Sequence, residues 1–198
     1  MKFQYLALVM TGLFFGVGAG DVRGQERSTA TGLWQQIDES TGKSQGWFLI
    51  YENGGVYEGA IAKMFVKPGD NPNPICTKCQ GEQKNAPSLG LTIIKGMHRD
   101  GLKYENGTIL DPRDGNIYNA LMELSPDGQT LAVRGYFGIS LFGRSQIWQR
   151  LPDTALAQVD PAVIAAHGPA LQPGAAASRK PVSPAPRQRA PAARGQER

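Results

Sequence analysis

Short apolar segments alternate with turn signals through the middle of the chain, from about residue 31 to residue 152. The clearest turn is Ser125-Pro126-Asp127-Gly128, where Pro126 presets φ for a type I turn and Gly128 accepts a positive φ. We therefore predict that the segments on either side, residues 116–124 and 130–137, pair as an antiparallel hairpin.

The other apolar segments are also short, and they are rich in Ile, Val, Tyr, Phe and Trp, which is typical of strands. Within residues 56–66 the even positions share one face and the odd positions share the other. The remaining candidate strands are residues 33–37, 46–51, 91–97, 102–104, 108–110 and 145–151. Because short turns connect these about eight to ten strands, the pattern predicts an all-β, up-and-down antiparallel barrel, whose closure removes exposed edges.

One connection is much longer than the others. Residues 67–88 contain four Pro and both Cys of the chain. Loops of this length are usually functional or flexible. We expect this one to cover one end of the barrel.

The first 20 residues differ in composition from the rest. They are almost free of charge, with Lys2 near the start and small residues at Gly18, Ala19 and Gly20. An uninterrupted membrane span needs about 20 apolar residues, and this run is shorter and rich in Gly. We predict that residues 1–20 are a secretory signal peptide, cleaved after Gly20 or after Gly24; the alternative is an uncleaved membrane anchor. The protein is then exported, and periplasmic if its source is a Gram-negative bacterium.

From residue 153 to the C-terminus the composition changes to Ala, Pro, Gln and Arg. Such a segment has too little bulky apolar surface to offset the entropy of ordering it. Residues 153–198 are therefore predicted to be a disordered tail that follows a β-barrel domain of residues 31–152. One exception is a short helix at residues 161–167, where Pro161 can occupy the first helical position.

The basic residues are concentrated in this tail. The whole chain carries a net charge of +4, but residues 31–154 have twelve basic and thirteen acidic side chains, and residues 155–198 have six and two. The tail could make a weak contact with an anionic envelope surface; a solvated linker is the alternative. Because no aromatic residue accompanies these charges, no specific nucleic-acid partner is predicted.

Residues in the first and last predicted strands resemble those of a known fold. Gly32-Leu33-Trp34 opens the first strand, and Trp148 and Arg150 end the last one. These positions resemble the Gly-x-Trp and the terminal Arg of lipocalin-like barrels. The resemblance implies that Arg150 lies across the ring of Trp34 and closes the bottom of the barrel.

Motifs spread along the domain resemble one family more closely. They are Cys76-x-x-Cys79-x-Gly81, Gly90-Leu91-x-Ile93, Gly107-Thr108-Ile109-Leu110-Asp111-Pro112, Gly115-Asn116-x-Tyr118 and Val133-Arg134-Gly135-Tyr136. In this order they closely resemble the bacterial exported family DUF2147, over roughly residues 31–151. The resemblance implies a lipocalin-like barrel exported to the periplasm, with no established activity. The Ala/Pro/Arg-rich tail departs from the family pattern.

Cys76 and Cys79 are the two cysteines of the chain. An exported protein meets an oxidising compartment, which favours a disulfide between them. A redox Cys-x-x-Cys normally lies at a helix N-terminus, and no helical pattern follows here. Zinc needs three or four ligands, and His98 is the one further candidate nearby in sequence. A structural disulfide is therefore the leading interpretation, with redox catalysis and metal binding as alternatives.

Asp111 and Asp114 form a carboxylate pair of the kind that glycosidases use. However, Asp-Pro-x-Asp-Gly is turn chemistry, because Asp side chains accept hydrogen bonds from the nearby backbone. His98 lacks a nucleophile elbow and a neighbouring acid. We therefore assign no catalytic residue, no cofactor and no metal ligand, and we do not expect an enzyme.

The orientation of Arg134 is left open by the alternation of its strand. If Arg134 and Tyr136 point into the barrel, the buried guanidinium must be paired, by Glu58, by Asp111 or by the carboxylate or phosphate of a ligand. If Leu131, Val133 and Phe137 form the inner row instead, Arg134 is solvated. The candidate ligand-binding residues are Arg134, Tyr136, Tyr118 and Tyr57.

Two functions fit these observations best, and a third, an enzyme on a barrel scaffold, stays open because fold does not fix function. The first is an exported, non-enzymatic barrel that binds a small apolar or amphipathic ligand in the barrel or at its mouth. The alternative is an envelope structural or interaction protein with a solid barrel, which contacts partners through the Cys-containing loop or the basic tail. A continuous internal pocket would favour the first, and a filled interior with an exposed aromatic patch would favour the second. The oligomeric state is not predicted.

Overall fold

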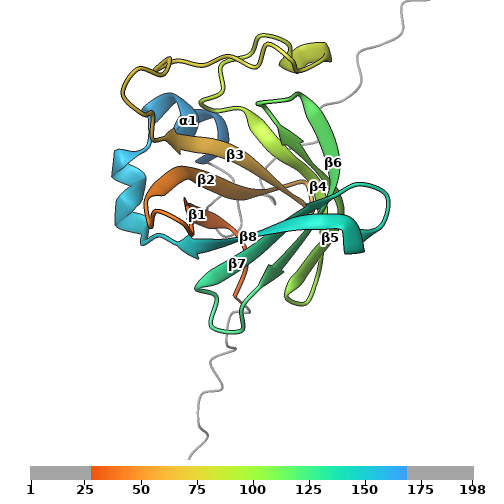
Figure 1. Ribbon diagram of the computed structural model, residues 1–198. Coiled ribbons are helices and arrows are strands. Elements are labelled where there is room, and N and C mark those ends of the chain that lie inside the picture. The colour runs from red at the N-terminus through yellow and green to blue at the C-terminus, as the bar shows by residue number, and fades with distance from the viewer. Residues whose placement is uncertain (1–27, 169–198) are drawn as a thin grey trace, which may run out of the picture.

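The computed structural model describes residues 28–168 (Figure 1). Eight antiparallel strands form a closed barrel in which each strand pairs with the next and the last pairs with the first. The strands are β1 (Gly32–Ile37), β2 (Ser44–Asn53), β3 (Val56–Met64), β4 (Thr92–Asp100), β5 (Lys103–Asp111), β6 (Asn116–Leu124), β7 (Thr130–Tyr136) and β8 (Gly143–Arg150). The prediction of an all-β, up-and-down barrel is confirmed, with eight strands.

The predicted hairpin is the pair β6 and β7. Its turn is closed by a hydrogen bond from the Gly128 N–H to the Ser125 carbonyl, at 2.8 Å, and Gly128 has φ of 72°. Leu124 pairs with Leu131 on the first rung of the ladder. The positive φ at Gly128 thus sets the register of both strands.

Strand β5 differs from the prediction, because residues 103–104 and 108–110 belong to one strand instead of two. The Asn-Gly sequence between them forms an irregularity within the strand: Asn106 has φ of 62°, and pairing with β6 shifts between Tyr104 and Gly107. A turn residue with positive φ can insert a bulge into a strand as well as reverse it. The prediction of two separate strands here is therefore wrong, because the unusual backbone at Asn106 makes a bulge within one strand.

Large side chains on the inward face of the strands form the core of the barrel. The largest fully buried ones include Trp34, Trp148, Tyr104, Met97, Met122 and Leu131. Phe48 stacks on Trp148 with ring centroids 4.2 Å apart, and Tyr57 meets Tyr104 edge to face at 4.7 Å. The interior is consequently packed with side chains, as small barrels of this size allow.

One end of the barrel is closed by Arg150. Its guanidinium carbon lies 4.2 Å from the centre of the Trp34 ring. It donates hydrogen bonds to the carbonyls of Gly128, Thr31 and Thr29, at 2.5, 2.8 and 2.6 Å. Burial lowers the pKa of Arg150, but a guanidinium stays protonated in proteins. The charged guanidinium of Arg150 thus holds residues 29–31, the segment before β1, across the end of the barrel.

A C-terminal segment covers the outer face of β1, β2 and β3 (Figure 1). It consists of the 3-10 helix η3 (Asp153–Gln158) and the helix α1 (Pro161–His167). Its buried Ala155, Val159 and Val163 form a second apolar cluster with outward-facing Leu33, Trp47, Leu49 and Ala62. Strands β1, β2 and β3 therefore each bury apolar side chains on both faces, and the outer face needs a cover.

This segment corrects the predicted domain boundary. Residues 153–168 form η3 and α1 on the barrel, so the prediction of disorder is wrong for these residues. The exception predicted at residues 161–167 is confirmed: α1 starts with Pro161, and Asp160 caps it by accepting a 2.7 Å hydrogen bond from the Ala162 N–H. The predicted signal peptide and residues 169–198 lie outside the described residues.

We expect Arg150→Met to lower the free energy of unfolding by about 3 kcal/mol, because three carbonyls lose a charged donor while the apolar stem is kept. Arg144→Met, at an exposed position of β8, is the matched control and should change stability by less than about 0.5 kcal/mol. Urea denaturation measures both. Equal stabilities of the two variants would contradict the role given to Arg150.

Candidate functional site

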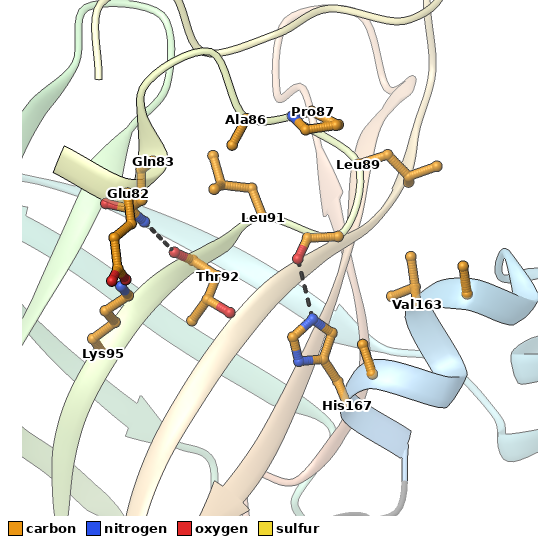
Figure 2. Close-up of a pocket in the computed structure, with 13 residues that line it drawn as sticks. Glu82, Gln83, Ala86, Pro87, Leu89, Leu91, Thr92, Lys95, Val163 and His167 are labelled. Carbon is orange, nitrogen blue, oxygen red and sulfur yellow. Dashed lines mark hydrogen bonds between the residues drawn. The ribbon is translucent and has the colours of Figure 1, made fainter. Parts of the chain in front are cut away.

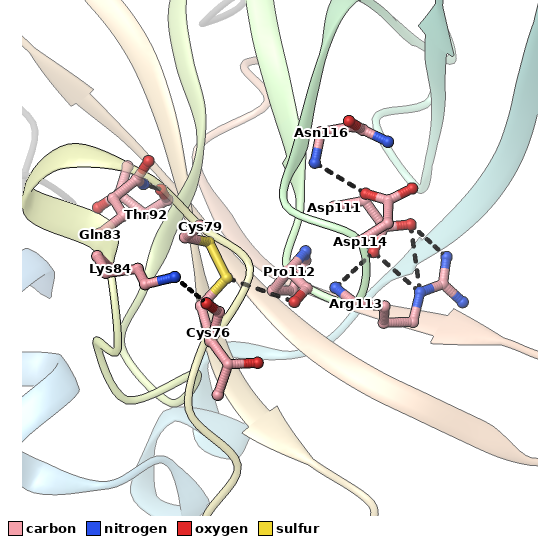
Figure 3. Close-up of a disulfide and its surroundings, with 11 residues drawn as sticks. Cys76, Cys79, Gln83, Lys84, Thr92, Asp111, Pro112, Arg113, Asp114 and Asn116 are labelled. Atoms are coloured by element: carbon pink, nitrogen blue, oxygen red, sulfur yellow. Dashed lines mark hydrogen bonds and ion pairs between the residues drawn. A yellow bond between two sulfur atoms is a disulfide. The ribbon is translucent and has the colours of Figure 1, made fainter.

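The disulfide organises the long connection between β3 and β4, residues 65–91, which we call the Cys loop. Cys76 and Cys79 are bonded and both fully buried (Figure 3). The sulfur of Cys76 lies 3.3 Å from the carbonyl oxygen of Pro112. At Gly115, a side chain would collide with the backbone of Lys78. The bond therefore holds the Cys loop against the turn between β5 and β6.

The bond between Cys76 and Cys79 confirms the predicted disulfide. The burial of both cysteines favours its structural interpretation. Redox cysteines need exposure and a helix N-terminus to lower the pKa of the thiol. The element that follows is a 3-10 helix, η1 (Gly81–Gln83), only three residues long. No group of three metal-ligating side chains occurs within residues 28–168.

The turn between β5 and β6 uses the acidic pair for structure. The guanidinium of Arg113 forms an ion pair with Asp111 at 2.6 Å and lowers the pKa of that carboxyl (Figure 3). Asp114 accepts hydrogen bonds from the Asn116 N–H at 2.9 Å and the Tyr118 hydroxyl at 3.1 Å, which also lower its pKa. A general acid needs a raised pKa. Both carboxyls are instead held ionised.

Arg134 points away from the barrel interior. Val133 pairs with Met122 and is buried with it, so the alternation places Arg134 on the outer face. Its guanidinium donates to the carbonyls of Ser140 and Leu141, at 2.7 and 3.2 Å, and to the hydroxyl of Ser145 at 2.7 Å. Of the two orientations that the sequence left open, the structure therefore has the outward one, in which Arg134 does not reach the barrel interior.

The other three candidate ligand residues do not converge with Arg134. Tyr136 lies on the same outer face, two residues along β7. Tyr57 is inside the core, where its ring meets Tyr104. Tyr118 lies on the inward-facing row of β6, near the end of the barrel opposite Arg150, and hydrogen bonds to Asp114. The predicted residues thus do not form one site.

A pocket of about 430 Å³ lies between the Cys loop, β4 and α1 (Figure 2). We call it the α1 pocket. Its lining residues are Glu82, Gln83, Ala86, Pro87, Leu89, Gly90, Leu91, Thr92, Lys95, Ala162, Val163, Ala166 and His167. Sequence reasoning missed this site, because the two sides lie about 70 residues apart and α1 was assigned to a tail.

Several contacts fix the walls of the α1 pocket. A ring nitrogen of His167, Nε2, lies 3.1 Å from the carbonyl oxygen of Gly90, and its ring stacks on Tyr51 with centroids 4.9 Å apart. Burial raises the pKa of Tyr51 to about 12. On the other wall, the side-chain amide of Gln83 donates to the carbonyl of Thr92 at 2.9 Å. These contacts hold α1 and the Cys loop in place on the two sides of the pocket.

The α1 pocket combines an apolar surface with a polar side. Figure 2 shows Leu91 and Leu89 between the two walls, with Glu82 and Lys95 together on one wall and His167 on the other. Binding sites for small molecules typically pair such apolar surface with a few polar groups that fix orientation. The arrangement suits a molecule with an apolar body and a polar head.

Comparison with solved structures identifies the architecture. The barrel is similar to HP1028 from Helicobacter pylori, a protein described as belonging to the lipocalin family, with a TM-score of 0.56 and 16% sequence identity. The match covers 67% of this chain and 90% of that one. At this identity the likeness shows the fold alone: the protein is a lipocalin-like barrel.

Residues 32–150 match the model of a family described as an uncharacterized protein conserved in bacteria, DUF2147, and the chain belongs to this family. The resemblance noted in the sequence is thereby confirmed. A search of curated proteins finds no match. No helix in the described part of the chain is long and apolar enough to span a membrane.

Proposed function

We propose that the protein is a non-enzymatic binding protein for a small amphipathic molecule, which it holds in the α1 pocket rather than inside the barrel. The observation that carries this proposal is that side chains fill the barrel interior, while a pocket lies outside the barrel. Trp34, Trp148 and Tyr104 are fully buried and occupy the interior, whereas the α1 pocket offers about 430 Å³ outside it. The barrel then acts as a rigid support for a site on its surface.

The chemistry of the α1 pocket supports an amphipathic ligand. Leu89, Leu91 and Val163 provide apolar contacts, and burying apolar surface supplies affinity at roughly 25 cal/mol per Å². The amine of Lys95 and the carboxyl of Glu82 offer one charge of each sign to a polar head. We propose no catalysis because the carboxyls of Asp111 and Asp114, the acid pair noted in the sequence, stabilise a turn.

A second candidate function, that of an interaction protein with a solid barrel, is favoured by a different observation. The loop between β7 and β8 exposes Phe137 and Leu141, each to about three quarters of its surface. The predicted contact of the basic tail with an anionic surface concerns residues outside the described range. The two functions are compatible, because α1 and this loop lie on different sides of the barrel (Figure 1).

We further propose that the protein is exported, because a buried disulfide suits an oxidising compartment and the first 20 residues have the composition of a signal peptide. The intact mass of the protein recovered from the bacterial envelope is expected to match a chain that begins at residue 21 or 25 with both cysteines oxidised. A full-length chain with two free thiols, recovered from the cytoplasm, would refute export.

The pocket is tested with a pair of neighbouring alanines on α1. Ala166 lines the α1 pocket, whereas Ala165 is exposed and does not. A Trp at position 166 fills the space, so Ala166→Trp should weaken binding of the fluorescent fatty acid dansylundecanoic acid roughly tenfold, or about 1.4 kcal/mol. Ala165→Trp should bind it like the parent protein. Fluorescence titration measures all three affinities.

Circular dichroism of both variants controls for folding. The proposal fails if the parent protein shows no saturable binding of the probe, or if Ala166→Trp and Ala165→Trp bind it equally well.

A further inference from the structure

Three large apolar side chains project from one short loop, residues 137–142, which we call the apolar loop. Phe137 is 75% exposed, Ile139 60% and Leu141 76%. Figure 1 shows the apolar loop extending past the barrel wall, on the side of the view away from α1. Single exposed apolar residues are ordinary, but a contiguous group marks an interaction site.

The apolar loop is held in this exposed conformation by Arg134. Two of its hydrogen bonds, at 2.7 and 3.2 Å, go to the carbonyls of Ser140 and Leu141 within the loop. The edge-to-face contact between Phe137 and Tyr118, with centroids 6.2 Å apart, anchors the other side. Because these contacts hold the backbone, binding has to order only the apolar side chains, which lowers its entropic cost.

Positive charge flanks the apolar loop. Arg134 precedes it on the outer face of β7, and Arg144, exposed at the start of β8, follows it on the opposite face of the sheet, paired with Gly135. Within residues 28–168 the one ion pair joins Arg113 to Asp111, so neither of these two guanidiniums is neutralised by a carboxylate. The exposed apolar side chains of the loop and the two nearby guanidiniums together suit a surface in which negatively charged groups cover an apolar layer. An anionic phospholipid bilayer has this chemistry.

The small size of the apolar loop also favours a bilayer over a protein partner. A stable protein interface usually buries about 1,200 Å² or more of total surface. Three side chains provide only a small part of that area. A lipid surface needs no complementary shape, and a few inserted side chains together with nearby cations suffice for reversible attachment.

We propose that the apolar loop docks the protein on anionic phospholipid surfaces. Phe137, Ile139 and Leu141 enter the interfacial layer, and Arg134 and Arg144 lie near the lipid phosphates. This contact is independent of the α1 pocket, because the two sites share no residue.

The test is co-sedimentation of the mature protein, recovered after export, with vesicles of phosphatidylglycerol and phosphatidylcholine, compared with phosphatidylcholine alone. The double variant Phe137→Ser/Leu141→Ser should lose roughly tenfold in partitioning to the anionic vesicles. The control Ile75→Ser/Ile147→Ser removes two other large exposed apolar side chains, 46% and 48% exposed, and should bind like the parent. The basic tail is present in every variant, so its own contribution cancels.

A second measurement places the apolar loop in the layer. Fluorescence of Leu141→Trp should be quenched by brominated lipids in anionic vesicles. The proposal is overturned if the parent protein binds anionic and neutral vesicles equally, if the loop variant and the control bind alike, or if the new Trp is not quenched. Preserved vesicle binding by the loop variant would assign the contact to the basic tail.

Discussion

The contact of Arg150 with Trp34 is the interaction on which the rest of the structure depends. An eight-stranded sheet must join its first and last strands, and here three residue pairs connect β1 to β8, as many as connect β3 to β4. Eight pairs connect β2 to β3. Arg150 reinforces the short seam with a cation–π contact and three hydrogen bonds that fasten residues 29–31 and the β6–β7 turn.

Closure has a consequence for where a ligand can bind. A closed barrel of eight strands has little internal space, and in this one Trp148 and Phe48 stack within it. The proposed binding site therefore lies outside the strands. The C-terminal segment packs on outward-facing Trp47 and Leu49, and this packing creates the α1 pocket where α1 meets the Cys loop. The C-terminal segment that covers the barrel therefore also forms one wall of the α1 pocket.

Local chemistry explains which features the sequence predicted well. The β6–β7 hairpin depends on Pro126 and Gly128, and the disulfide depends on two cysteines three positions apart, so neither needs distant information. Asn106 is harder, because a positive φ suits both a turn and a bulge, and only pairing with β6 decides. The Arg150 contact was accessible only through resemblance to a known fold.

Other features depend on choices that alternation cannot make. Arg134 and Val133 are neighbours on one strand, and the pairing of Val133 with Met122 decides which of them faces the core. Predicting the α1 pocket required knowing that α1 packs against the barrel. Its signal was the apolar Val159, Val163 and Ile164 within an otherwise small-residue segment, together with strands apolar on both faces. The average composition of residues 153–198, which is dominated by Ala, Pro, Gln and Arg, did not reveal this apolar signal.

The most direct test of this account is methyl NMR of the protein, labelled at Met and Ala, during titration with dansylundecanoic acid. Met97 and Met122 are fully buried inside the barrel, whereas Ala162 and Ala166 line the α1 pocket. The account predicts that the methyl signals of the two alanines shift while those of the two methionines stay in place. Shifts confined to Met97 and Met122 would show that the ligand enters the barrel, and would contradict it.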